Sequence, residues 1–369
     1  MLRLAIKNLL QERLRLGISL GGVVAAFFMT LLLQGVLAGA TQQLVAYPQR
    51  SDADVWVMQV GVSNMHMATS VLPLGLKEAV RKVPGVKDVT PILYTSTSLQ
   101  AGGRQWFSYI VGVRPGAKRG GPWAMKEGST STGAGEVVIS FVLARKAGIG
   151  LGDSVAIAGR PFRVIGLSEE TFSMANSVTF IAFEEMEALL DAQGVASYFL
   201  VKAASDTSPE DLAARIKRAV PGVNAMSREA FAESDRSMAE QMGVDMIGVM
   251  STIGFAVGVL VIGLTIYTAT VRRASEYGVV KALGTKNRQL VALIAVQTLV
   301  LSLLGLGLAT AVAFLLRPLM QSVVPEAPLV YPAKTLGRLT ASALSIAALA
   351  SFLPACRIVR VQPAQIFKE

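Results

Sequence analysis

The sequence has 369 residues, of which 52% are hydrophobic and only 16% are charged, and its formal net charge is +10. This composition is too apolar for an ordinary soluble protein of two or three domains. The positive charge would suggest a nucleic-acid partner if it were spread over a soluble domain, but it gathers beside apolar runs, so no nucleic acid is expected.

The chain opens with a basic segment and a long apolar run. Over residues 1–15, apolar side chains recur at helical spacing between arginines and lysines, which predicts an amphipathic helix in the cytoplasmic interface of a membrane. The uncharged residues 16–40 predict the first transmembrane helix. A cleaved signal peptide is the alternative, but its apolar core has only about 7 to 15 residues. We therefore expect this run to stay in the membrane.

Residues 41–244 are of mixed composition and predict a folded domain, here called the inserted domain. Short runs of β-branched and aromatic residues, bounded by Gly, Pro and Asp, predict strands at 54–58, 106–113, 136–139, 154–157, 162–165, 178–182 and 198–202. Helices are expected between them, at 74–82, 141–147, 183–190 and 209–219. A Gly- and Ser-rich loop over 112–135 is expected to separate two subdomains.

Three further apolar runs predict transmembrane helices over 245–271, 289–316 and 339–356, because about 20 apolar residues in a helix cross the hydrocarbon core of a bilayer. The segments that join or follow them are a link at 272–288, a loop at 317–338 and a tail at 357–369. Buried core helices are the alternative, strongest for the short last run. The predicted fold is a membrane protein with four transmembrane α-helices and a large extracytoplasmic mixed α+β domain between the first helix and the second.

The charges predict how the chain lies in the membrane. Segments 1–15, 272–288 and 357–369 together hold 12 Lys and Arg against 3 Asp and Glu, whereas the inserted domain is nearly balanced. Basic segments beside spans stay in the cytoplasm, so both termini are expected there and the inserted domain outside. The single cysteine, Cys356, excludes a disulfide-stapled scaffold. A multi-pass protein of a bacterial inner membrane is expected.

The sequence contains few residues of the types that catalytic and cofactor sites require. His66 is the only histidine and Cys356 the only thiol, so neither a metal site nor a nucleophile with its base is expected. We interpret His66 as an ordinary surface residue. The dipeptide Gly-Lys of a Walker A loop does not occur, so the chain is not expected to be an enzyme, and any ATP and Mg²⁺ would be bound by another chain. The spans also lack the ionisable residues of an ion-coupled carrier.

Small residues recur at spacing four in the first two spans. Such spacing lets helix backbones approach closely in lipid, within one chain or across a dimer. The candidate residues are Gly17, Gly21, Gly35, Gly39, Gly254 and Gly258.

The link between the second and third spans has the most distinctive pattern. Glu276, Val279, Val280 and Leu283 fall on one helical face, and Gly284 is a typical helix stop. Glu276 is also spaced to pair with Arg272. A short amphipathic helix with a free apolar edge is therefore expected, lying either on membrane lipid or in a partner's groove.

These residues carry a resemblance to a known family. The link Arg272-Arg273-x-x-Glu276-x-Gly278-x-x-Lys281-Ala282-Leu283-Gly284 resembles the signature of FtsX-like permease domains of bacterial ABC transporters. The start Ala5 to Leu10 and the end Pro354 to Ile366 are similar to those of that family. The inserted domain resembles the MacB-type periplasmic core, through pieces such as Gly152-Asp153-Ser154-Val155.

The resemblance implies a permease subunit that works with a separate ABC ATPase, as a homodimer, and it leaves open a further partner, a periplasmic adaptor. ATP hydrolysis would then drive motion of the inserted domain for export or extraction of a substrate. The residues implied to couple to the ATPase are Arg272, Arg273, Glu276, Tyr277, Gly278, Val280, Lys281, Ala282, Leu283 and Gly284. The alternatives are an FtsX-like regulator of cell-wall hydrolases without transport, and a receptor or adhesion protein.

Overall fold

The computed structural model describes residues 13–66, 68–172, 177–272, 274–323 and 329–359. The described residues divide into a helical unit, 13–38 with 243–323 and 329–359, and a second unit, 39–242, which corresponds to the inserted domain. Most of the predicted interfacial helix and most of the tail lie outside the described residues, as does Arg273.

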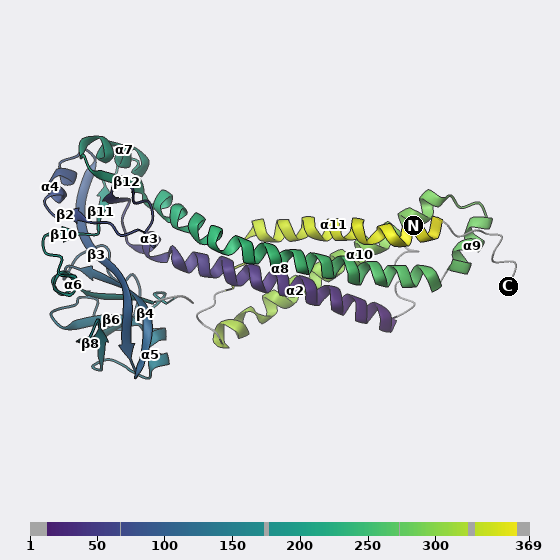
Figure 1. Ribbon diagram of the computed structural model, residues 1–369, viewed down its shortest axis with the longest axis horizontal. Coiled ribbons are helices and arrows are strands. Elements are labelled where there is room, and N and C mark those ends of the chain that lie inside the picture. Colours follow the sequence, from purple (N-terminus) through teal and green to yellow (C-terminus); the bar gives the residue numbers. More distant parts are fainter. Residues whose placement is uncertain (1–12, 67, 173–176, 273, 324–328, 360–369) are drawn as a thin grey trace. The chain divides into compact units, whose positions relative to one another are not determined.

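Four long helices make up the helical unit (Figure 1). They are α2 (Arg13–Leu44), α8 (Arg228–Arg272), α10 (Asn287–Val323) and α11 (Ala333–Val359). Each contains a segment long and apolar enough to cross a membrane: Leu20–Leu44, Thr252–Arg272, Asn287–Met320 and Ala333–Val359. The predicted four-span fold is confirmed. One difference is that α8 begins at Arg228, well before the expected start of the second span, so a single helix joins the inserted domain to that span.

Close backbone approaches hold these helices together. A Cβ added at Gly305 in α10 would lie 2.4 Å from Val23 Cγ1 of α2, and one added at Gly254 in α8 would lie 2.6 Å from Thr30 Oγ1 of the same helix α2. Ser302 also donates a 2.8 Å hydrogen bond to the carbonyl of Ala343 in α11. In lipid, such contacts replace the hydrophobic effect as the cause of helix association.

The six predicted glycines fall into different surroundings. A Cβ at Gly258 would lie 2.9 Å from Ile346, and one at Gly35 would lie 2.5 Å from Tyr331, so both face other parts of the helical unit. Gly39 is buried. Gly17 and Gly21 instead have no described atom within 4 Å of an added Cβ. Gly17 and Gly21 are therefore open to a neighbouring helix in the membrane.

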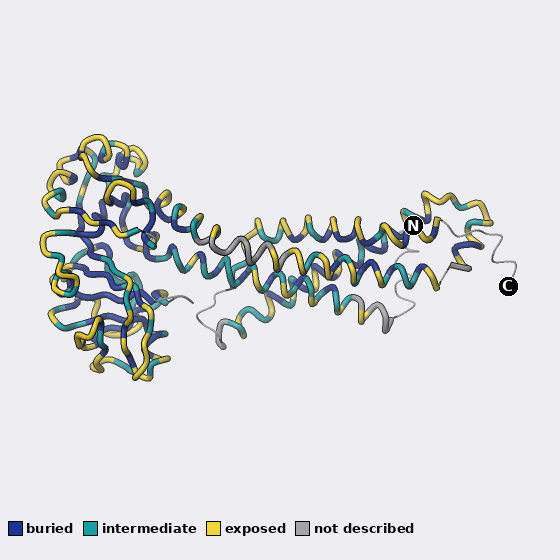
Figure 2. Tube along the Cα trace, viewed as in Figure 1, coloured by how far each residue is buried: buried dark blue, intermediate teal, exposed yellow. Residues whose placement is uncertain are grey.

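The inserted domain is built on one ten-stranded mixed sheet with the strand order β12-β1-β11-β3-β4-β9-β6-β8-β5, in which β7 pairs with β3 and β8. Its strands are β1 (Val55–Gln59), β3 (Val86–Ala101), β4 (Arg104–Val113), β5 (Met125–Gly128), β6 (Glu136–Ser140), β7 (Ser154–Ile157), β8 (Arg160–Ser168), β9 (Ser177–Ala182), β11 (Tyr198–Ala203) and β12 (Val223–Ser227). A small second sheet pairs β2 (Leu72–Pro73) with β10 (Val195–Ala196). Figure 2 shows buried residues along the strands.

Short helices accompany the sheet. They are α3 (Ala46–Arg50), α4 (Leu76–Arg81), α5 (Phe141–Ala147), α6 (Phe183–Leu190) and α7 (Pro209–Ala219). Ser208 caps α7 by accepting a 3.2 Å hydrogen bond from the N–H of Asp211, and α5 ends at Gly148, whose φ of 68° an L side chain would resist. The predicted mixed α+β domain is confirmed. The segment expected to be a loop over 112–135 contains the strand β5.

Two glycines of α10 provide a matched test of the helix packing. Gly305→Ala should lower the free energy of unfolding by about 1–3 kcal/mol, because the new methyl group overlaps Val23. Gly307→Ala should have little effect, since no described atom lies within 4 Å of its added Cβ. The measurement is the apparent melting temperature of the full chain in detergent. Equal melting temperatures for the two variants would contradict this packing of α2 against α10.

Candidate functional site

The predicted link helix is present as α9 (Ala274–Ala282). On one side of it Glu276, Val279, Val280 and Leu283 are exposed to solvent, and Leu283 reaches 82% exposure. Exposed apolar side chains that gather on one side of a helix are typical of a surface that a partner or lipid covers. The predicted free apolar edge is therefore present in the structure.

The opposite side of α9 is fixed to the helical unit. Tyr277 and Gly278 are buried, and the ammonium group of Lys281 donates a 2.9 Å hydrogen bond to the carbonyl of Val359 at the end of α11. Gly284, at φ 93°, reverses the chain after the helix. These contacts hold α9 while its other face stays accessible.

The remaining predicted link residues lie at the edges of this helix. Arg272 is exposed as the last described residue of α8, and Glu276 lies in the first turn of α9. The structure records no ion pair between these two described side chains. Ala282 is exposed at the end of α9. Arg273 lies outside the described residues.

A second notable region is where the two stems, α2–α3 and α8, enter the inserted domain. The chain leaves α3 into β1 and leaves β12 into α8, and these two strands pair antiparallel, with Val55 opposite Ser227. Trp56 and Phe231 stack with their ring centroids 4.8 Å apart and an interplanar angle of 16°. Tyr198 packs edge-on against both rings. We call this region, with His66 and Asp235, the junction.

The interpretation of His66 as an ordinary surface residue is wrong. Its side chain is only 13% exposed, and Nδ1 lies 2.9 Å from Oδ1 of Asp235, a carboxylate in α8 that is fully buried. The same Oδ1 accepts a 3.0 Å hydrogen bond from the N–H of Met65. His66 therefore ties the loop after β1 to the helix that becomes the second span.

Burial in the junction perturbs its tyrosines. Desolvation raises the pKa of Tyr94 and Tyr198 well above the ordinary value, and the nearby charge of Asp235 adds to both shifts. These phenols therefore stay neutral at physiological pH. The junction is an aromatic core around one buried carboxylate.

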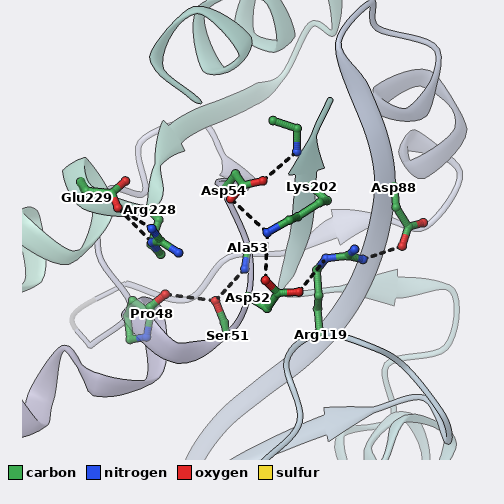
Figure 3. A network of polar contacts seen from close by, with 11 residues as sticks. Pro48, Ser51, Asp52, Ala53, Asp54, Asp88, Arg119, Lys202, Arg228 and Glu229 are labelled. Atoms are coloured by element: carbon green, nitrogen blue, oxygen red, sulfur yellow. Dashed lines mark hydrogen bonds and ion pairs between the residues drawn. The ribbon is translucent and has the colours of Figure 1, made fainter. Parts of the chain in front are cut away.

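A network of charged groups holds the first stem in place (Figure 3). Arg119 is almost buried and lies between Asp52, just after α3, and Asp88 in β3. Lys202 in β11 donates a 2.9 Å hydrogen bond to Asp52 and a 3.3 Å bond to Asp54. The bond to Asp52 is the main cause that raises the pKa of Lys202. Partial burial acts to raise the pKa of Asp88, but hydrogen bonding and the charge of Arg119 outweigh it and lower the pKa.

Comparisons with known proteins agree with this architecture. The profile of the MacB-like periplasmic core domain matches residues 16–219, and that of the FtsX-like permease C-terminal domain matches residues 248–363. The chain belongs to the MacB/FtsX family of ABC transporter permeases. It is accordingly a multi-pass membrane protein, and its relatives are permeases that imply a partner ATPase.

Individual relatives of this permease cover different parts of it. An uncharacterized ABC transporter permease of Mycobacterium tuberculosis is 26% identical over 371 residues, which are 100% of this chain and 99% of that protein. The putative hemin transport system permease protein HrtB of Staphylococcus haemolyticus is 22% identical over 178 residues, 47% of this chain and 48% of that one.

Two solved structures are also similar to the permease. The extracellular domain of the noncanonic ABC-type transporter YknZ from Gram-positive bacteria has a TM-score of 0.38 at 16% identity, covering 47% of this chain and 99% of that one. The periplasmic region of MacB from Actinobacillus actinomycetemcomitans has a TM-score of 0.39 at 16% identity, covering 51% and 95%.

The junction can be tested by removing its buried carboxylate. Asp235→Ala leaves the N–H of Met65 and the ring of His66 without their acceptor. The free energy of unfolding should therefore fall by about 2–3 kcal/mol. Glu233→Ala, in the same helix but 64% exposed, is the control and should cost less than about 0.5 kcal/mol. Thermal unfolding followed by tryptophan fluorescence reports on both, because Trp56 lies in the junction. Similar melting temperatures in the two variants would rule out this role for Asp235.

Proposed function

We propose that this permease couples ATP hydrolysis by a separate ATPase subunit to motion of its inserted domain, for export or extraction of a substrate. The observation that carries the proposal is α9, whose apolar face is exposed while its other face is held by the helical unit. A surface that is both fixed and apolar suits docking by a partner protein.

The distribution of charge supports an orientation for the complex. The basic segment around α9 and the basic ends of the chain favour the cytoplasmic side, where an ATPase has access to ATP. Both termini would then lie in the cytoplasm, and the inserted domain would lie outside.

The two stems provide a route for force. α8 is one helix from Arg228 to Arg272, so a displacement near α9 reaches the inserted domain without crossing a flexible loop. At the junction this helix is joined to the first stem by the β1–β12 ladder and the Trp56–Phe231 stack. Paired strands and packed rings resist separation, so the inserted domain would move as a body.

Docking at α9 predicts a specific loss of partner binding. Leu283→Asp or Glu276→Ala should reduce the co-purified ATPase by about tenfold or more, as removal of a central contact costs about 2 kcal/mol. Melting temperatures should stay unchanged, because both side chains are exposed. Leu151→Asp, an exposed leucine of the inserted domain, is the matched control.

Undiminished recovery of the ATPase with Leu283→Asp would refute the docking role. In the native membrane, an adaptor recovered with the complex would favour export, whereas a cell-wall hydrolase would favour the regulatory alternative.

We also propose that the permease works as a homodimer through α2. Its residues Gly17, Gly21, Ala25, Met29 and Leu33 are exposed at spacing four, so they form one ridge that winds slowly around the helix. The two glycines leave room for a second backbone.

The dimer can be tested with two equivalent glycines. Gly21→Leu should shift the protein toward the monomer by light scattering in detergent, because the side chain fills the proposed contact. Gly307→Leu, at an equally open glycine of α10, should leave the mass unchanged. A dimer that persists in Gly21→Leu would refute this interface.

A further inference from the structure

A cavity of about 440 Å³ opens in the inserted domain beside the end of the first stem. Its walls come from Arg50 to Asp52 at the end of α3, from the loop 113–123, and from residues 130–132. This volume lies in the range of small-molecule sites, about 300–1,000 Å³.

The cavity favours a negatively charged ligand. Arg50, Arg114 and Lys118 line it, and its one acidic group, Asp52, is already neutralised by Lys202 at 2.9 Å and Arg119 at 3.6 Å. Arg114 and Lys118 make no ion pair with any described residue. Arg50 pairs with Glu170 at 3.2 Å, but both side chains are more than half exposed, and such a pair contributes little.

The rest of the lining suits the polar end of an amphiphile. Trp123 and Phe180 form an apolar wall, with ring centroids 6.3 Å apart in an edge-on arrangement. Three hydroxyl residues also line the cavity: Thr130, Ser131 and Thr132. A hydroxyl group can donate a hydrogen bond to a phosphate oxygen. Tryptophan is typical of the zone where lipid headgroups meet protein.

The chain itself limits how far this cavity lies from the membrane. The first candidate span ends at Leu44, and α3 (Ala46–Arg50) follows almost directly. Arg50 follows Leu44 by six residues, which is roughly 10 Å along the chain at the helical rise of 1.5 Å per residue. The headgroup region adds about 5–7 Å to each side of the hydrocarbon core, so a long arginine side chain can reach it.

We propose that this cavity binds the phosphate headgroup of an anionic lipid from the leaflet next to the inserted domain. The proposal does not depend on ATPase docking at α9. A soluble phosphate ester offers the same charge and is the competing source of ligand. The short stretch of chain between Leu44 and the Arg50 side of the cavity favours the lipid.

The experiment is native mass spectrometry of the full chain in detergent, titrated with phosphatidylglycerol or with zwitterionic phosphatidylcholine. The pocket variant is Arg114→Ala with Lys118→Ala. The control, Arg160→Ala with Lys217→Ala, removes the same charge from exposed positions of the same domain outside the cavity. A parallel titration with glycerol 1-phosphate examines the soluble source.

The proposal predicts that phosphatidylglycerol binds about tenfold or more weakly to the pocket variant than to the control, with phosphatidylcholine equal in both. Lys118→Arg as a single change should retain wild-type binding. Equal phosphatidylglycerol binding in the pocket and control variants would overturn the proposal. So would a pocket variant that loses only glycerol 1-phosphate, since the ligand would then be soluble. Matching melting temperatures of the two double variants exclude misfolding as the cause of a loss.

Discussion

The hydrogen-bonded ladder between β1 and β12 holds together the two stems that lead from the inserted domain to the membrane. Each stem continues into a candidate span. The ladder therefore links two spans that are far apart in sequence. Removing these hydrogen bonds would leave polar backbone groups without partners next to a buried aromatic core, which costs free energy. The rest of the inserted domain builds outward from this pair, through β11 and then β3.

Two kinds of interaction support the ladder, and they differ in strength and purpose. The aromatic stack of Trp56 and Phe231 is buried and packs the first turn of α8 against β1. The charges around Arg119 and Lys202 are partly solvated, so each pair contributes modestly, but together they fix Asp52 at the end of the first stem. The same network neutralises Asp52 and leaves the neighbouring cavity positive.

The sequence was most informative where physics acts locally. Spans follow from runs of apolar residues. The free face of α9 follows from the helical spacing of Val279, Val280 and Leu283, which can be seen without knowing the rest of the fold. His66 could not be predicted, because its partner Asp235 lies 169 residues away and only the folded sheet brings them together. The sequence holds one signal for this partner: Asp235 lies four positions after Phe231, so a helix would place both residues on the same side. The strand β3 is similarly obscured by its Thr and Ser residues and by Pro91.

Motion of the inserted domain as one body can be measured through the distance between spin labels in the full chain with Cys356→Ser, co-purified with its ATPase. One pair of labels joins the two units, at exposed Leu151 and Leu344, and a second pair, at Leu151 and Val60, lies within the inserted domain. If the inserted domain moves as one body, ATP should change the first distance and leave the second unchanged. An unchanged first distance, or a change confined to the second pair, would contradict motion of the inserted domain as one body.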